Sequence, residues 1–107
     1  MTEVKFFVSD NRIHGFEISG HTGYSEYGSD IVCSAVSSAA LMTANTITEV
    51  IGDEAEVDCN DGYIYLKAEK CSDSTFDILE GLRIHLTEIS KQYPENIKII
   101  YGGTKNA

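Results

Sequence analysis

The chain has few basic residues. Only 8 of its 107 residues are Lys or Arg, against 17 Asp and Glu, which gives a formal net charge of −9. A field of that sign repels phosphates and argues against direct nucleic-acid binding. A basic protein partner fits the charge better, although an acidic surface also serves solubility alone.

The N-terminus lacks the features of a targeting segment. Met1 to Lys5 contains no basic run followed by a long apolar stretch, so we expect no signal peptide. We also expect no segment of membrane-spanning length and no membrane association. Linkers, low-complexity tracts and repeats are absent, and this length can bury one modest core. We therefore expect a single domain over residues 1–107, located in the cytoplasm.

Cysteine is scarce, and its spacing is not that of a metal site. Cys33, Cys59 and Cys71 make an odd number with no CxxC pair. This pattern argues against a disulfide framework or a structural zinc site. We therefore expect no metal and no cofactor. Cys59 is predicted to be a core strand residue, and Cys71 an exposed loop thiol.

Alternation of apolar and polar side chains predicts five strands. They cover approximately residues 4–8, 13–19, 54–60, 63–69 and 97–101. Asp10-Asn11 marks a tight turn between the first two. Asp61-Gly62 favours a type I′ turn between the third and fourth, because these residues tolerate positive φ.

Two other segments have helical periodicity. The first runs from about Asp30 to Ile51, with Ser29 or Asp30 as its N-cap and Gly52 at its end. Its main stripe is Val32, Val36, Ala39, Ala40, Thr43, Ile47 and Val50. A second face carries Ala35, Ser38, Ala39 and Met42. A helix with two such faces is buried on two sides, so we expect one to cover the sheet and the other to meet a second subunit.

The second helix is predicted from about Ser74 to Tyr93, where Pro94 stops it. The element order is then ββαββαβ. Two hairpins imply a mainly antiparallel sheet with both helices on one face. The predicted fold class is therefore α+β, a two-layer sandwich.

The segment from Gly20 to Cys33 joins a predicted strand end to a predicted helix start. His21 follows the strand, and Cys33 falls in the first turn of the helix. A histidine can take the thiol proton, while free N–H groups at a helix start favour a thiolate and offer an oxyanion hole. The pattern predicts a Cys–His dyad. The alternative is structural, with a small buried cysteine and a strand-end histidine satisfied by backbone.

The loop from Thr22 to Ser29 lies between these two residues. Gly23 and Gly28 permit close backbone approach to a substrate, and Tyr24 and Tyr27 are suited to the walls of a peptide cleft. We expect the loop to close over an extended peptide. An ordinary surface loop is the alternative. A phosphate-binding loop is excluded, because the glycine spacing is wrong and no lysine follows.

Two polar residues flank the predicted nucleophile on the same helix. Asp30 is suited to capping the helix, to orienting the base or to holding a substrate group. Ser37 lies one turn after Cys33 on the same face, where it either lines the cleft or packs against a neighbour. His14 and His85 have no cysteine nearby in sequence and are predicted to be structural.

Together these motifs resemble the ribosomal-processing cysteine protease family Prp, the YsxB-like proteins. The matching residues are Gly20-His21, Gly28, Asp30-Ile31-Val32-Cys33 and the Ala/Ser-rich helix that follows. The resemblance covers essentially the whole chain, including its length and element order. Thr22 and Ser34 depart from it, since small residues, often alanine, are common there in the family.

The resemblance implies a bacterial cytosolic endopeptidase. Its members remove the short N-terminal extension of a large-subunit ribosomal protein, the twenty-seventh in standard naming, and so support ribosome assembly and translation. It also implies a His21–Cys33 dyad, substrate contacts by Asp30 and Ser37, and a homodimer with a helical interface. With the loop residues added, the expected substrate-binding set is Asp30, Ser37, Gly20, Gly23, Tyr24 and Tyr27.

Two other functions fit the same residues. One is a non-catalytic, ribosome-associated binding module of the same fold. The other is a thiol redox sensor at Cys33, and the absence of a nearby resolving cysteine in the sequence argues against it.

Overall fold

The computed structural model describes residues 1–20 and 27–103, with only the backbone described for residues 27–30. Its elements follow the predicted order. They are β1 (Thr2–Ser9), β2 (Arg12–Ser19), α1 (Tyr27–Asn45), the short π-helix η1 (Thr46–Ile51), β3 (Ala55–Asn60), β4 (Tyr63–Ala68), α2 (Asp73–Gln92) and β5 (Ile97–Gly102).

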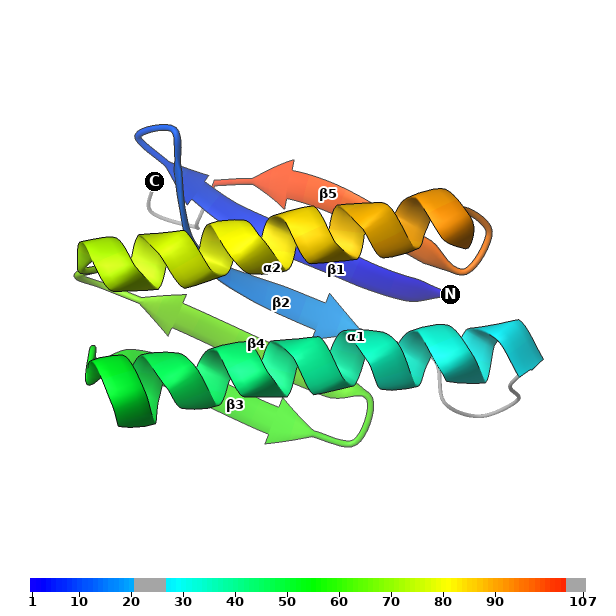
Figure 1. Ribbon diagram of the computed structural model, residues 1–107, viewed down its shortest axis with the longest axis horizontal. Coiled ribbons are helices and arrows are strands. Elements are labelled where there is room, and N and C mark those ends of the chain that lie inside the picture. The colour runs from blue at the N-terminus through cyan, green and yellow to red at the C-terminus, as the bar shows by residue number, and fades with distance from the viewer. Residues whose placement is uncertain (21–26, 104–107) are drawn as a thin grey trace.

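The five strands form one sheet in the order β3-β4-β2-β1-β5, so β2 is central. The pairings β1–β2, β2–β4 and β3–β4 are antiparallel, and β1–β5 is parallel. Both helices lie on the same face of the sheet (Figure 1). The prediction of a two-layer, mainly antiparallel α+β fold is therefore confirmed.

The hydrophobic core fills the space between the sheet and the two helices. Its largest fully buried apolar side chains are Phe6, Phe16, Ile47, Leu66, Leu79 and Leu86. Side chains of this size each contribute roughly 1.5–3 kcal/mol on burial. The predicted stripe of the first helix is confirmed at Val32, Val36, Ala40 and Ile47, but Val50 is 79% exposed and lies outside the core.

The two hairpin turns differ in backbone conformation. Asp10 and Asn11 have φ values of 54° and 62°, as a type I′ turn requires. In the second turn Gly62 has a positive φ of 74°, whereas Asp61 does not. The type I′ prediction at Asp61-Gly62 is therefore wrong. The carbonyl of Gly62 accepts a hydrogen bond from the N–H of Gly20 at 2.9 Å, which ties this turn to the end of β2.

The first helix begins earlier than predicted. Because α1 starts at Tyr27, Asp30 lies inside it and does not cap it, and Cys33 lies in its second turn. A cap is worth only about 1 kcal/mol, so a capping residue alone does not fix where a helix begins. The last predicted turns form the π-helix η1, which ends at Gly52 with a φ of 85°.

The segment Ile31–Ile51 is 21 residues long and, by length and composition alone, apolar enough to cross a membrane. The expectation that no segment reaches that length is therefore wrong. In the structure Val32, Val36, Ala40 and Ile47 of this segment are fully buried. A helix that packs its apolar side on a protein core meets the same length and composition test.

The strand β3 lies at the edge of the sheet, and most of its side chains are exposed. Cys59, predicted to be a core residue, is exposed, and Val57 is 48% exposed. Both share a face with the buried residues of β4 with which they pair, Ile64 and Leu66. The prediction fails because an edge strand can have the correct alternation without being covered by a helix.

The start of α2 is held by one carboxylate. Ser72 is its N-cap, and Asp53 accepts hydrogen bonds from the Ser72 N–H at 2.8 Å, the Ser72 hydroxyl at 2.9 Å and the Thr75 hydroxyl at 2.6 Å. These bonds, that from Thr75 most of all, hold the pKa of Asp53 below its usual value.

This depressed pKa predicts an acid-dependent loss of stability. Because the folded-state pKa is lower than the unfolded one, the contribution of Asp53 is complete above pH 3.8 and is lost as the pH falls through the folded value. Urea unfolding at neutral and at strongly acidic pH should show that Asp53→Ala lowers the free energy of unfolding at neutral pH and much less in acid. The matched change Asp77→Ala, at an exposed position of α2 outside this hydrogen-bonded group, is the control for removing one carboxylate from the helix. An Asp53→Ala deficit that is equal at both pH values would contradict this account.

Candidate functional site

One pocket brings together several residues that the sequence predicts for the site. It has a volume of about 240 Å³ and lies where the end of β2 meets α1 and the β3–β4 hairpin; we call it the Cys33 pocket. Its lining residues are Thr2, Ile18, Gly20, Cys33, Ser37, Leu41, Cys59, Asn60, Asp61, Gly62, Tyr63 and Ile64. Gly20, Cys33 and Ser37 are thus brought together, and their roles stay predictions.

The end of β2 lies directly against the thiol. A Cβ atom at Gly20 would lie 3.7 Å from Sγ of Cys33 and 3.5 Å from Oγ1 of Thr2. These are ordinary contact distances, so a larger side chain at this position would crowd the sulfur. His21 is the next residue in the sequence. His21, Gly23 and Tyr24 lie outside the described residues.

Cys33 is half-buried on α1, with its neighbour Val32 fully buried in the core. The first four N–H groups of a helix are the ones without an intrahelical partner, and here they belong to residues 27–30. The prediction that Cys33 lies in the first turn, together with these groups, is therefore wrong. Tyr27 and Asp30 belong to the first turn of α1, and Tyr27 is not a loop residue.

The lining of the Cys33 pocket combines apolar and polar residues. Ile18, Leu41 and Ile64 supply aliphatic surface. The Tyr63 hydroxyl donates a hydrogen bond to Glu17 Oε2 at 2.6 Å, and this bond, more than burial, raises the pKa of Tyr63 to about 12. Because side chains alternate along a strand, Tyr63 and Glu17 point to the face of the sheet opposite that of Ile18 and Ile64. A phenol held neutral in this way is unsuited to acid–base chemistry near neutral pH.

A second cysteine lies beside a histidine at the other end of the molecule. Sγ of Cys71 is 3.8 Å from Nδ1 of His14, although 57 residues separate them in sequence. The prediction of an exposed, incidental Cys71 is therefore wrong: its thiol is half-buried. The sequence carries no signal for this contact, because β2 and the β4–α2 connection meet only in the folded chain.

This second pair lacks the properties of an activated nucleophile. Burial, and next the negative charge of Asp53, raise the pKa of Cys71, with only a partial opposing effect from Arg12. A raised pKa keeps the thiol protonated, whereas nucleophilic attack requires the thiolate. The ring of His14 packs edge-on against that of Phe76, with the ring centroids 5.3 Å apart. The contact of His14 with Cys71 therefore fits the predicted structural role of this histidine.

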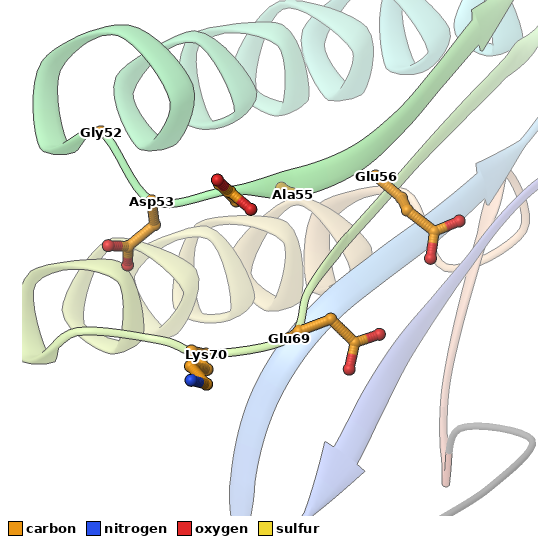
Figure 2. Close-up of a pocket in the computed structure, with 7 residues that line it drawn as sticks. Gly52, Asp53, Ala55, Glu56, Glu69 and Lys70 are labelled. Atoms are coloured by element: carbon orange, nitrogen blue, oxygen red, sulfur yellow. The ribbon is translucent and has the colours of Figure 1, made fainter.

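A larger pocket of about 520 Å³ lies near the start of β3 and has an acidic lining (Figure 2). Its lining residues are Gly52, Asp53, Glu54, Ala55, Glu56, Glu69 and Lys70. Among these there is no thiol and no imidazole. Within the described ranges, no group of three or more His, Cys, Asp or Glu side chains is arranged to hold a metal ion. Of the two pockets, the Cys33 pocket alone has a lining suited to thiol chemistry.

Known proteins resemble this chain in sequence over most of its length. The sequence model of the family described as cysteine protease Prp matches residues 1–98. The ribosomal processing cysteine protease Prp of Bacillus subtilis (strain 168) is 27% identical over 97 residues, which cover 84% of this chain and 87% of the relative. The protein of the same name from Staphylococcus aureus (strain Mu50) is 28% identical over 105 residues, covering 94% and 99%.

Solved structures resemble this fold over nearly its whole length. The S. aureus protease Prp in complex with a substrate peptide has a TM-score of 0.87 and 26% identity, covering 94% of this chain and 99% of that chain. The same protein with a covalently linked product peptide has a TM-score of 0.82 and 27% identity, with the same coverage.

The approach of Gly20 to the thiol can be tested by alkylation. With Cys59→Ser and Cys71→Ser in place, iodoacetamide reports on Cys33 alone. We expect Gly20→Val to slow alkylation about tenfold, because its methyl groups would lie against the sulfur and restrict access. Gly20→Ala, whose Cβ fits at ordinary contact distance, should react at close to the wild-type rate. An unchanged rate in Gly20→Val would contradict the described geometry.

Proposed function

This chain belongs to the cysteine protease Prp family, and we propose that it is an endopeptidase that removes the short N-terminal extension of a large-subunit ribosomal protein, the twenty-seventh in standard naming. The observation that carries the proposal is the Cys33 pocket, in which a half-buried thiol lies against the end of the strand that precedes His21. The names of the relatives, which include ribosomal processing, support the choice of substrate class.

The proposed mechanism uses Cys33 as nucleophile and His21 as general base. The Cys33 sulfur attacks the scissile carbonyl carbon while its proton passes to the imidazole. The imidazolium then protonates the leaving amine, and water hydrolyses the thioester with His21 again acting as base. His21 directly follows Gly20 in the sequence, and a Cβ atom at Gly20 would lie 3.7 Å from the Cys33 sulfur. The covalently linked product peptide of the S. aureus relative agrees with nucleophilic catalysis.

Substrate binding is proposed for residues around the same pocket. Ser37 lines it one turn after Cys33, and Ile18, Leu41 and Ile64 supply apolar surface for the aliphatic part of a peptide side chain. Asp30, Gly20, Gly23, Tyr24 and Tyr27 complete the proposed set. The net charge of −9 favours capture of a basic ribosomal protein, and a cytoplasmic location is proposed with that substrate.

The protease proposal can be tested with the purified, extension-bearing ribosomal protein as substrate. Mass spectrometry should show loss of the extension with the wild-type chain. We expect Cys33→Ala and His21→Ala each to lower kcat/KM by about a thousandfold or more, because each removes one half of a unit that acts together.

The second Cys–His pair provides matched controls. Cys71→Ala and His14→Ala remove the same chemical groups elsewhere in the fold and should change kcat/KM by less than about threefold if the variants fold normally. A substrate that stays intact with wild type would defeat the protease proposal, and binding without cleavage would favour the binding module. Loss of activity in Cys71→Ala but not in Cys33→Ala would move the nucleophile to the other pair.

We also propose a homodimer through the first helix. On the predicted second face of α1, Met42 is 56% exposed, Ser38 is exposed, and Ala35 and Ala39 are partly exposed. Met42 also lines a groove of about 270 Å³ between α1 and α2. An exposed apolar surface of this kind supports an interaction site.

Light scattering after size-exclusion chromatography should give twice the chain mass of 11.8 kDa. Met42→Glu should shift this mass toward the monomer, because it places a charge in the proposed interface. The control Ile84→Glu changes an equally exposed apolar residue of α2 and should leave the dimer intact. A wild-type monomer at micromolar concentration would rule out the dimer.

A further inference from the structure

The Cys33 pocket contains one formal charge among its described lining residues, and that charge belongs to Asp61. None of the ion pairs found in residues 1–20 and 27–103 includes Asp61. The neighbouring polar side chain is engaged elsewhere, since the Asn60 amide donates to Asp58 Oδ1 at 3.1 Å. The Asp61 carboxylate is therefore available to a bound molecule.

The position of Asp61 is fixed by the fold. It lies in the two-residue turn between β3 and β4, and its neighbour Gly62 accepts the 2.9 Å hydrogen bond from Gly20. A Cβ atom at Gly20 would lie 3.7 Å from Sγ of Cys33. Asp61 therefore lies on a turn that is hydrogen-bonded to Gly20, the residue beside the thiol. Asp61 and Cys33 both line the Cys33 pocket.

We propose that Asp61 is a specificity-determining residue that recognises a Lys or Arg side chain of the substrate segment bound in the Cys33 pocket. This inference rests on the proposed protease function. The aliphatic side chains of Ile18, Leu41 and Ile64 accommodate the long alkyl stem of a Lys or Arg side chain. The charged end of that Lys or Arg then meets the Asp61 carboxylate. Asp61 is outside the substrate-binding set predicted from the sequence, because the sequence does not place the second hairpin beside Cys33.

A local contact at Asp61 differs from the general attraction that an acidic chain exerts on a basic substrate. The net charge of −9 attracts any basic substrate and acts mainly on association. A contact at Asp61 instead singles out one substrate position and responds to the sign of that one charge. Reversing the charge at Asp61 and at single substrate positions distinguishes this local contact from the general attraction.

The test begins with the extension-bearing ribosomal protein, whose cleaved bond is located by mass spectrometry. Each Lys or Arg near that bond is then replaced by Glu in turn, and kcat/KM is measured. For wild type we expect one of these replacements to lower kcat/KM about fivefold, as a partly exposed ion pair allows. Asp61→Asn should lose this discrimination, and Asp61→Lys should reverse it in favour of the Glu-bearing substrate. Raising the salt concentration should weaken the wild-type preference.

The control is Glu56→Gln, which removes one negative charge from β3 without touching the Cys33 pocket and should keep the wild-type preference. Asp61 has a negative φ, so Asn and Lys both fit its backbone, and thermal melting checks that the variants are folded. Failure of wild type to cleave overturns the protease function itself. Cleavage by wild type with the same substrate preference in Asp61→Asn and Asp61→Lys overturns the role of Asp61 alone.

Discussion

The candidate site depends on how the central strand β2 ends. At that point the Gly20 N–H donates to the Gly62 carbonyl, and a Cβ atom at Gly20 would lie 3.7 Å from the Cys33 sulfur. One residue therefore joins the sheet centre, the second hairpin and the first helix. Because β2 is paired on both sides, this junction is held by the part of the sheet that is hardest to distort. The proposed base, His21, follows it directly in the chain.

Most of the fold could be predicted from local patterns. Alternation found all five strands, and the three-and-four spacing found both helices, because burial of one face fixes these periods. The errors lie where the tertiary structure overrides a local preference. Asp30 has a preference for capping a helix but lies inside α1. Asp61-Gly62 favours a type I′ turn but does not adopt one, and the carbonyl of Gly62 accepts a hydrogen bond from Gly20. Cys59 has the correct alternation but lies on an edge strand that the helices leave exposed.

The site could be predicted only as far as one continuous stretch of chain supplies it. Cys33 and Ser37 share a helix face at four-residue spacing, so the structure finds both in one pocket with Gly20. Asp61 and Cys59 also line that pocket, but they belong to a hairpin far along the chain, so no local sequence pattern predicts their position. The contact of His14 with Cys71 was missed for the same reason. The two cysteines also differ in environment: Cys33 lines a pocket, whereas burial and Asp53 keep the thiol of Cys71 protonated.

In the proposed mechanism, peptide-bond cleavage passes through a thioester on Cys33. The most direct measurement is peptide mapping by mass spectrometry of a reaction quenched in acid within its first turnovers. We expect the proteolytic fragment that contains Cys33 to carry the added mass of the removed N-terminal extension. Attachment of that mass to the fragment containing Cys71 or Cys59, during confirmed cleavage, would contradict this mechanism.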